Sequence, residues 1–319
     1  DTAELFDRYR KRRSQKWKQL LKNPLSLRIP VLDPDLFLTR WVHRLAWLFS
    51  RQGALLWSIV VVPAVLLASV HWKELTNNLS DQVLATNNLL LLLFVFPAIK
   101  ALHELGHGFA TKAWGGTVHE MGIMFLVFAP VPYVDASSSS AFHSKRQRAV
   151  VGMAGMLVEL FLAALAMYIW VLVEPGLLRA IAFNVMFVAG VSTLIVNGNP
   201  LLRFDGYYIL ADLIEIPNLA QRGQQYLKYL SDRYLFGARD LEPPNETASE
   251  KRWLTVYAIT SWSYRILLTI SIILFISNEF FIFGVLLGVW GAISLLGMPI
   301  WKSVKHVLES PSLQRHRSR

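Results

Sequence analysis

The chain has 319 residues, of which 54% are hydrophobic and only 17% are charged, and its formal net charge is +10. Its apolar residues gather in blocks of about 20, the length a helix needs to cross a bilayer, which excludes an ordinary soluble globular class. Cysteine is absent, which excludes disulfides and thiolate zinc sites and leaves nitrogen and oxygen as the metal ligands.

Residues 1–50 form a basic N-terminal segment. Eight Lys and Arg residues fall within residues 8–22, in a stretch predicted to be helical and ended by prolines. The positive charge lies mostly outside the apolar blocks, where it marks the cytoplasmic side of a membrane protein rather than a nucleic-acid surface. This segment either lies on anionic lipid or is a solvated helix. Because the chain starts at Asp1 with a charged stretch unlike a signal peptide, we expect it to be part of a longer protein.

Six apolar segments predict an all-α polytopic membrane protein. The expected spans cover about residues 54–70, 87–112, 149–173, 180–196, 253–276 and 280–300. Lys and Arg concentrate at both ends of the chain and in the second and fourth loops, whereas the first and third loops are nearly neutral. This alternation places both termini in the cytoplasm, and we expect a bacterial inner membrane. The expected parts are a basic segment (1–50), a catalytic membrane core (51–214), a cytoplasmic polar connector (215–252), a transmembrane hairpin (253–301) and a basic tail (302–319).

Residues 117–134 interrupt the helical pattern. Their sequence, TVHEMGIMFLVFAPVPYV, is apolar and rich in β-formers, and it ends in a pair of prolines. The stretch is too short and too interrupted for another span. It predicts a short membrane-associated β-hairpin or re-entrant segment.

The sequence His103-Glu104-Leu105-Gly106-His107 is the strongest chemical signal. Two imidazoles one helical turn apart can bind one zinc ion, and Glu104 is then placed to act on the water that the zinc activates. Ionisable groups inside a span are functional candidates, although the same side chains could instead face the aqueous cytoplasmic mouth of the span and be solvated.

A catalytic zinc has a third protein ligand and one open position. Ala110 and Ala113 exclude the metzincin continuation of the motif. The other candidates are His119, His143, Glu159 and Asp205. We favour Asp205, because its span ends on the same side as His107 and because Pro200 and Gly206 allow the chain to turn back. The alternative for Asp205 is an ordinary N-cap before Tyr207.

With NPLLRFDG at residues 199–206 as the second motif, the chain resembles the site-2 protease family of intramembrane zinc metalloproteases. EMGIMFLVFAPVPYVDAS and NGNPLLRFDGYYILADLIEIPNL bring it closer to the bacterial peptide zinc metalloprotease branch. The resemblance covers about residues 50–215. It implies that His103, His107 and Asp205 ligate Zn²⁺, that Glu104 is the catalytic base, and that the β-rich stretch presents an extended substrate. Leu202 departs from the proline of the commoner motif.

Weaker predictions concern substrate binding and a charge pair. Asn197 and Asn199, with Phe125 and Val127 of the β-rich stretch, are the expected substrate-binding residues, although the asparagines could equally cap helices or join them. Glu159 and Arg265 lie in mid-span, and we expect them to pair with each other. Lys100 is expected to extend along the helix towards water.

The expected function is therefore that of a membrane-embedded zinc metalloendopeptidase acting on membrane-spanning or membrane-associated peptides. The alternative is a zinc-containing component of a peptide export or binding complex, whose structural site would be closed by His119 or His143. A membrane oxidase or desaturase is a weak third hypothesis, since its sites need more histidines within the spans.

Overall fold

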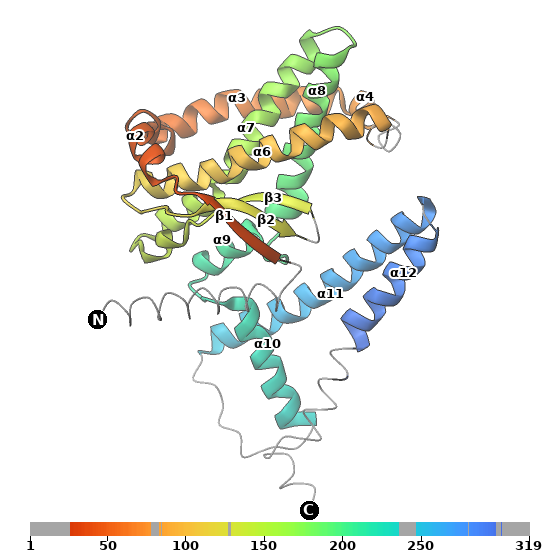
Figure 1. Cartoon of the computed structure of the whole chain (residues 1–319). Coiled ribbons are helices and arrows are strands. Elements are labelled where there is room, and N and C mark those ends of the chain that lie inside the picture. Colours follow the sequence, from red (N-terminus) through yellow and green to blue (C-terminus); the bar gives the residue numbers. More distant parts are fainter. Residues whose placement is uncertain are drawn as a thin grey trace, which may run out of the picture. The chain divides into compact units, whose positions relative to one another are not determined.

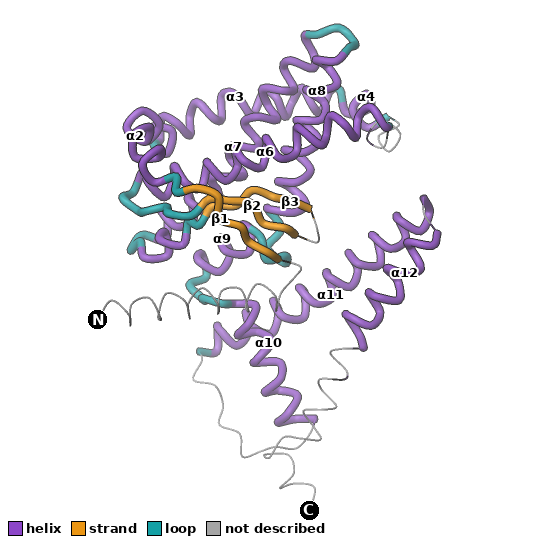
Figure 2. Tube along the Cα trace, in the orientation of Figure 1, coloured by secondary structure: helices purple, strands orange, loops and turns teal. Residues whose placement is uncertain are grey.

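The computed structural model describes residues 26–77, 83, 85–126, 129–235, 247–279, 281–297 and 301 (Figures 1 and 2). The basic segment at residues 8–22, Val127 and the tail at residues 302–319 lie outside these ranges, so the predictions made for them stay untested. The chain divides into two compact units. One comprises Asp1–Asn199 and Phe204–Ile209, and the other comprises Pro200–Arg203 and Leu210–Arg319.

Five helical stretches among the described residues are long and apolar enough to cross a membrane, as expected of a multi-pass membrane protein. They cover Arg51–Val70 (α3), Asn88–Ala113 within α6 (Thr86–Ala113), Lys145–Leu172 (α7), Leu177–Asn197 and Ala248–Asn278 within α11 (Ala248–Glu279). The fourth joins α8 (Leu177–Met186) to a π-helical segment, η3 (Phe187–Asn197). These match the first five predicted spans. The sixth is not confirmed, because its described part is α12 (Phe281–Ala292) followed by η5 (Ile293–Gly297).

Shorter elements connect the long helices. They are α2 (Asp35–Leu45), η1 (Ala46–Phe49), α4 (Trp72–Thr76), η2 (Ser137–Ala141), α9 (Asp205–Leu213), α10 (Leu219–Leu230) and η4 (Ser231–Leu235).

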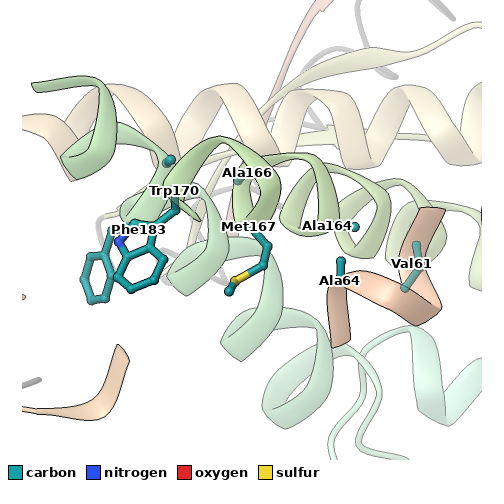
Figure 3. Packing of buried hydrophobic residues seen from close by; sticks show 8 residues of the cluster. Val61, Ala64, Ala164, Ala166, Met167, Trp170 and Phe183 are labelled. Atoms are coloured by element: carbon teal, nitrogen blue, oxygen red, sulfur yellow. The ribbon is translucent and has the colours of Figure 1, made fainter. Parts of the chain in front are cut away.

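Helix α7 is the centre of the first unit, and it packs against α3, α6 and α8 (Figure 1). Figure 3 shows the buried cluster between α3, α7 and α8, where Met167, Trp170 and Phe183 fill the space beside small alanines. Two hydrogen bonds add direction to this packing: Trp57 donates to the carbonyl of Leu157, and the Tyr168 hydroxyl donates to a carbonyl of α3. Dispersion contacts, directed by such bonds, hold helices together inside a membrane.

A three-stranded antiparallel sheet lies in the same unit. Its strands are β1 (Ser26–Leu32), β2 (Met121–Leu126) and β3 (Ala129–Val134), in the order β1-β2-β3. The predicted hairpin is confirmed as β2 and β3. Strand β1 was not predicted, because it comes from the basic segment, where Pro30 favoured a break.

Two prolines fix which groups β3 turns outward. Pro130 and Pro132 stand opposite Phe125 and Ile123 of β2. A proline has no N–H to donate, so these are the pairs without ladder hydrogen bonds. The main-chain groups of Pro130, Pro132 and Val134 therefore face away from β2. On its outer edge β3 therefore offers carbonyl oxygens but almost no donors. The exception is the N–H of Val134.

The second unit contains an antiparallel helix pair. A Cβ added to Gly288 would lie 3.6 Å from Ile273 of α11, and one added to Gly291 would lie 3.2 Å from Ile273 and from Thr269, so the two helices pack closely. Helix α10 packs on α11, where the Arg222 guanidinium lies 3.1 Å from the Glu250 carboxylate. Helices α11 and α12 pack against each other, and their role as a transmembrane hairpin stays a prediction.

Candidate metal centre

Three predicted ligands come together in the first unit. His103 and His107 stand one turn apart on α6, and Asp205 begins α9 after the turn that follows η3. Their ligand atoms all lie within 4.8 Å of one another. The Nε2 atoms of the two histidines are 3.0 Å apart. Oδ2 of Asp205 lies 3.1 Å from Nε2 of His103 and 3.6 Å from Nε2 of His107.

These separations fit a tetrahedral zinc ion. Zinc binds nitrogen and oxygen at about 2.0–2.2 Å, which sets neighbouring tetrahedral ligands about 3.3–3.6 Å apart. Oδ2 of Asp205 is also buried without an aligned hydrogen bond within the described part of the chain. A cation between the three atoms would satisfy it, so the residues fit the ion that the motif implies.

The second nitrogen of each imidazole faces α7. Nδ1 of His107 lies 2.7 Å from the carbonyl oxygen of Val151, and Nδ1 of His103 lies 3.2 Å from Oε1 of Glu159. A histidine that ligates a metal usually donates its other N–H to a carbonyl or a carboxylate, which fixes the ring and directs Nε2 to the metal.

Two glycines allow the ligands to approach. A Cβ on Gly155 of α7 would lie 2.4 Å from Nε2 of His103, so only glycine leaves room for that ring. A Cβ on Gly206 would lie 2.7 Å from the backbone of Gly198, so the turn before α9 closes tightly. This close turn brings Asp205 back to α6.

Asp205 is held in its charged form. Burial acts to raise the pKa of this carboxyl, but the neighbouring imidazoles of His103 and His107 outweigh that effect and keep it below the usual range. An ionised carboxylate is the form that ligates a metal.

Glu104 lies beside the ligands and contacts the sheet. Its Oε2 accepts a 2.9 Å hydrogen bond from the N–H of Val134, the last outward amide of β3. A carboxylate accepts several hydrogen bonds, so Glu104 retains acceptor capacity for a further donor.

The alternative fourth ligands do not join this group among the described residues. His119 is exposed, and its Nδ1 lies 3.2 Å from Asp33. His143 is exposed in the segment before α7. Among the described residues, the group that could hold a metal ion therefore consists of His103, His107 and Asp205, without His119 or His143.

The predicted substrate-binding residues have separate placements. Asn197 is buried and donates to Oε2 of Glu159 at 3.5 Å, and Asn199 is half-buried in the turn that leads to Asp205. Phe125 lies on the central strand β2, so its main-chain groups pair within the sheet. Contact of these residues with a substrate stays a prediction, and Val127 lies outside the described residues.

The expected partner of Glu159 is wrong. Its opposite charge comes from Lys100, whose Nζ lies 2.6 Å from Oε1 of Glu159 and 2.5 Å from Oγ of Ser192. Arg265 donates its Nε to the carbonyl of Ser261 on its own helix. Lys100 is buried instead of extending to water, because the packed helices leave it a carboxylate at closer reach.

Comparison with known proteins gives one relevant similarity. Over 149 residues, 46% of its length, the chain is 28% identical to "Putative peptide zinc metalloprotease protein YydH" of Bacillus subtilis (strain 168). The match spans 57% of that protein. No protein-family model and no solved structure matches the chain. The chain is therefore distantly similar to a protein described as a zinc metalloprotease, and its group of His103, His107 and Asp205 could hold a metal ion.

Proposed function

We propose that this chain is a membrane-embedded zinc metalloendopeptidase. The observation that carries the proposal is the group of His103, His107 and Asp205, arranged at tetrahedral spacing with one position open and with Glu104 next to the first ligand. The distant similarity to a protein named as a zinc metalloprotease supports the same activity.

The ion would supply Lewis-acid activation of a water molecule and of a peptide carbonyl. Glu104 accepts the proton of the attacking water and then delivers it to the leaving amine. His103 and His107 would bind the ion through Nε2 as neutral imidazoles, with the one ring proton on Nδ1, which faces an acceptor on α7 in each case. The ligands come from candidate spans and from the turn that follows one of them, which favours substrates that are membrane-spanning or membrane-associated peptides.

The sheet offers one edge for an extended peptide. Strand addition needs alternating donors and acceptors. The outer edge of β3 lacks donors at Pro130 and Pro132, and its Val134 N–H is taken by Glu104. The other edge strand, β1, has the outward N–H of Arg28, since Ile29 and Leu27 stand opposite the β2 residues that face β1. We therefore propose that the outer edge of β1 is where a substrate strand pairs.

The test uses the full chain purified in detergent. Metal analysis should give one zinc per chain in the wild type and in Glu104→Gln, and almost none in His103→Ala. Cleavage of a membrane-spanning peptide, followed by mass spectrometry, should occur only in the wild type. Zinc binding without cleavage in the wild type would overturn the protease proposal and support the export or binding component. A wild type that binds no zinc would overturn both.

A further inference from the structure

A buried polar network lies behind His103, on the side away from the metal ligands' shared centre. Helix α7 presents Val151, Gly155 and Glu159 at intervals of one turn, so the three lie on one face. The first accepts from His107, the second makes room for the His103 ring, and the third reaches Nδ1 of His103. Helix α6 runs antiparallel beside this face and places Lys100 next to Glu159.

Glu159 is fully buried and uses both oxygens. Oε1 faces Lys100 and His103, whereas Oε2 accepts from Thr193 and Asn197 of η3. Segment η3 leads through Gly198 into the turn that carries Asp205. One carboxylate thus touches a predicted ligand and the segment that delivers another.

The geometry at His103 leaves Glu159 as its orienting group. Nδ1 of His103 is buried and has no aligned hydrogen bond in the described residues, and the Glu159 oxygen 3.2 Å away is the acceptor it faces. A small rotation of the carboxylate would align the bond. A buried ion pair gives a fold little stability over apolar residues of the same size, so the position of this pair against a ligand points to the metal centre.

We propose that Glu159 is a positioning residue of the metal centre. It fixes the ring and the Nδ1–H tautomer of His103 so that Nε2 faces the ion, and Lys100 supplies the charge that keeps the buried carboxylate in place. This inference rests on the proposed zinc site.

The test measures metal affinity and the absorption spectrum of bound Co²⁺ in the full chain. Losing an orienting group typically weakens metal binding by about 10–100-fold. Glu159→Gln keeps an acceptor and should lose less metal affinity than the double variant Lys100→Met/Glu159→Leu. The double variant should lose about 10–100-fold in metal affinity and shift the absorption bands of bound Co²⁺. The double variant replaces both charges by apolar residues of similar size and should fold even where the single variant does not. Ser192→Ala removes a contact of Lys100 that does not reach His103, so its metal affinity and Co²⁺ spectrum should match those of the wild type.

A second comparison separates positioning from general packing. The double variant should weaken Zn²⁺ binding while the helical content and the thermal unfolding of the metal-free chain stay close to those of the wild type, because Glu159 acts on the ion through the residues that it positions. Wild-type affinity and an unshifted Co²⁺ spectrum in the double variant would overturn the inference while leaving the zinc site intact. Failure of the wild type to bind either metal would instead overturn the proposed function.

Discussion

The backbone N–H of Val134 donates a 2.9 Å hydrogen bond to Oε2 of Glu104. The proposed catalytic base therefore also holds the last outward amide of β3. A glutamine can accept this bond and an alanine cannot, although both remove the base. We expect Glu104→Ala, but not Glu104→Gln, to increase hydrogen exchange of the β3 backbone, and we expect both variants to be inactive. Equal protection of β3 in the alanine variant and the wild type would show that the bond does not anchor the strand.

Gly155 is expected to be required for metal binding. Alanine is the better helix former, but its Cβ would lie 2.4 Å from Nε2 of His103 and displace the ring. Gly155→Ala should therefore weaken zinc binding by about tenfold or more, as measured by competition with a chelator. Gly190→Ala is the matched control, because a Cβ there meets nothing within 4 Å. Equal affinities of the two variants would contradict the packing of α7 against His103.

The third ligand can be identified by comparing Asp205 with His119. Asp205→Asn removes the charged ligand oxygen, so zinc affinity and cleavage should both fall. His119→Ala should change neither, because His119 is exposed and lies beside Asp33. Full zinc affinity in Asp205→Asn would place the third ligand elsewhere.

Asp35 joins the start of α2 to the end of α6. Its Oδ1 accepts from Nζ of Lys112 at 2.6 Å and from the N–H of Val118 at 2.9 Å, and these two bonds lower the pKa of Asp35. A lowered folded-state pKa contributes stability above the unfolded value of about 3.9, and this contribution is lost as the pH falls through the folded value. Asp35→Asn should cost about 1–2 kcal/mol at pH 7.

Thermal unfolding of the wild type and Asp35→Asn over a range of pH measures this effect. The difference between their midpoints should be constant from neutral pH down to about 5 and shrink below about 4. A difference that persists unchanged at lower pH would mean that the variant acts through packing instead of charge.

The orientation of the spans can be tested in a chain that has no cysteine. Ser140→Cys and Glu174→Cys place single thiols at exposed positions, on the loops predicted to be cytoplasmic and extracytoplasmic. An impermeant maleimide added to intact cells should label only Glu174→Cys, and Ser140→Cys should react only after the membrane is opened. Thr111→Cys, at a fully buried position, should stay unlabelled in folded protein. Labelling of Ser140→Cys in intact cells would reverse the topology.

The sequence was most informative where local spacing carries the chemistry. The interval between His103 and His107 fixes a shared helix face, and the turn residues around Asp205 indicated a chain reversal, so the close grouping of these three side chains was predictable. The apolar blocks identified five helices for the same local reason. The β2–β3 hairpin followed from a run of β-formers ending in prolines.

Partners set by tertiary packing were beyond the sequence. No local sequence pattern predicts the pairing of β1 with β2, because these two strands are far apart in the chain. The carbonyl of Val151 that orients His107 is a backbone group, and no residue type announces it. The prediction for Lys100 considered only its own helix and missed its ion pair with Glu159. The one-turn spacing of Gly155 and Glu159 on an apolar span was a usable signal that this helix has a polar face.

The ligands arise from two distant stretches of the chain, with the hairpin, α7 and α8 between them. An ion bound to His107 and Asp205 would hold these two stretches together in the folded chain, and the ligands would separate in the unfolded chain. Since the site does not exist in that state, the free energy of metal binding becomes free energy of folding. Zinc supply would then set the lifetime of the protein as well as its chemistry: a chain deprived of the ion would open more often and be degraded sooner.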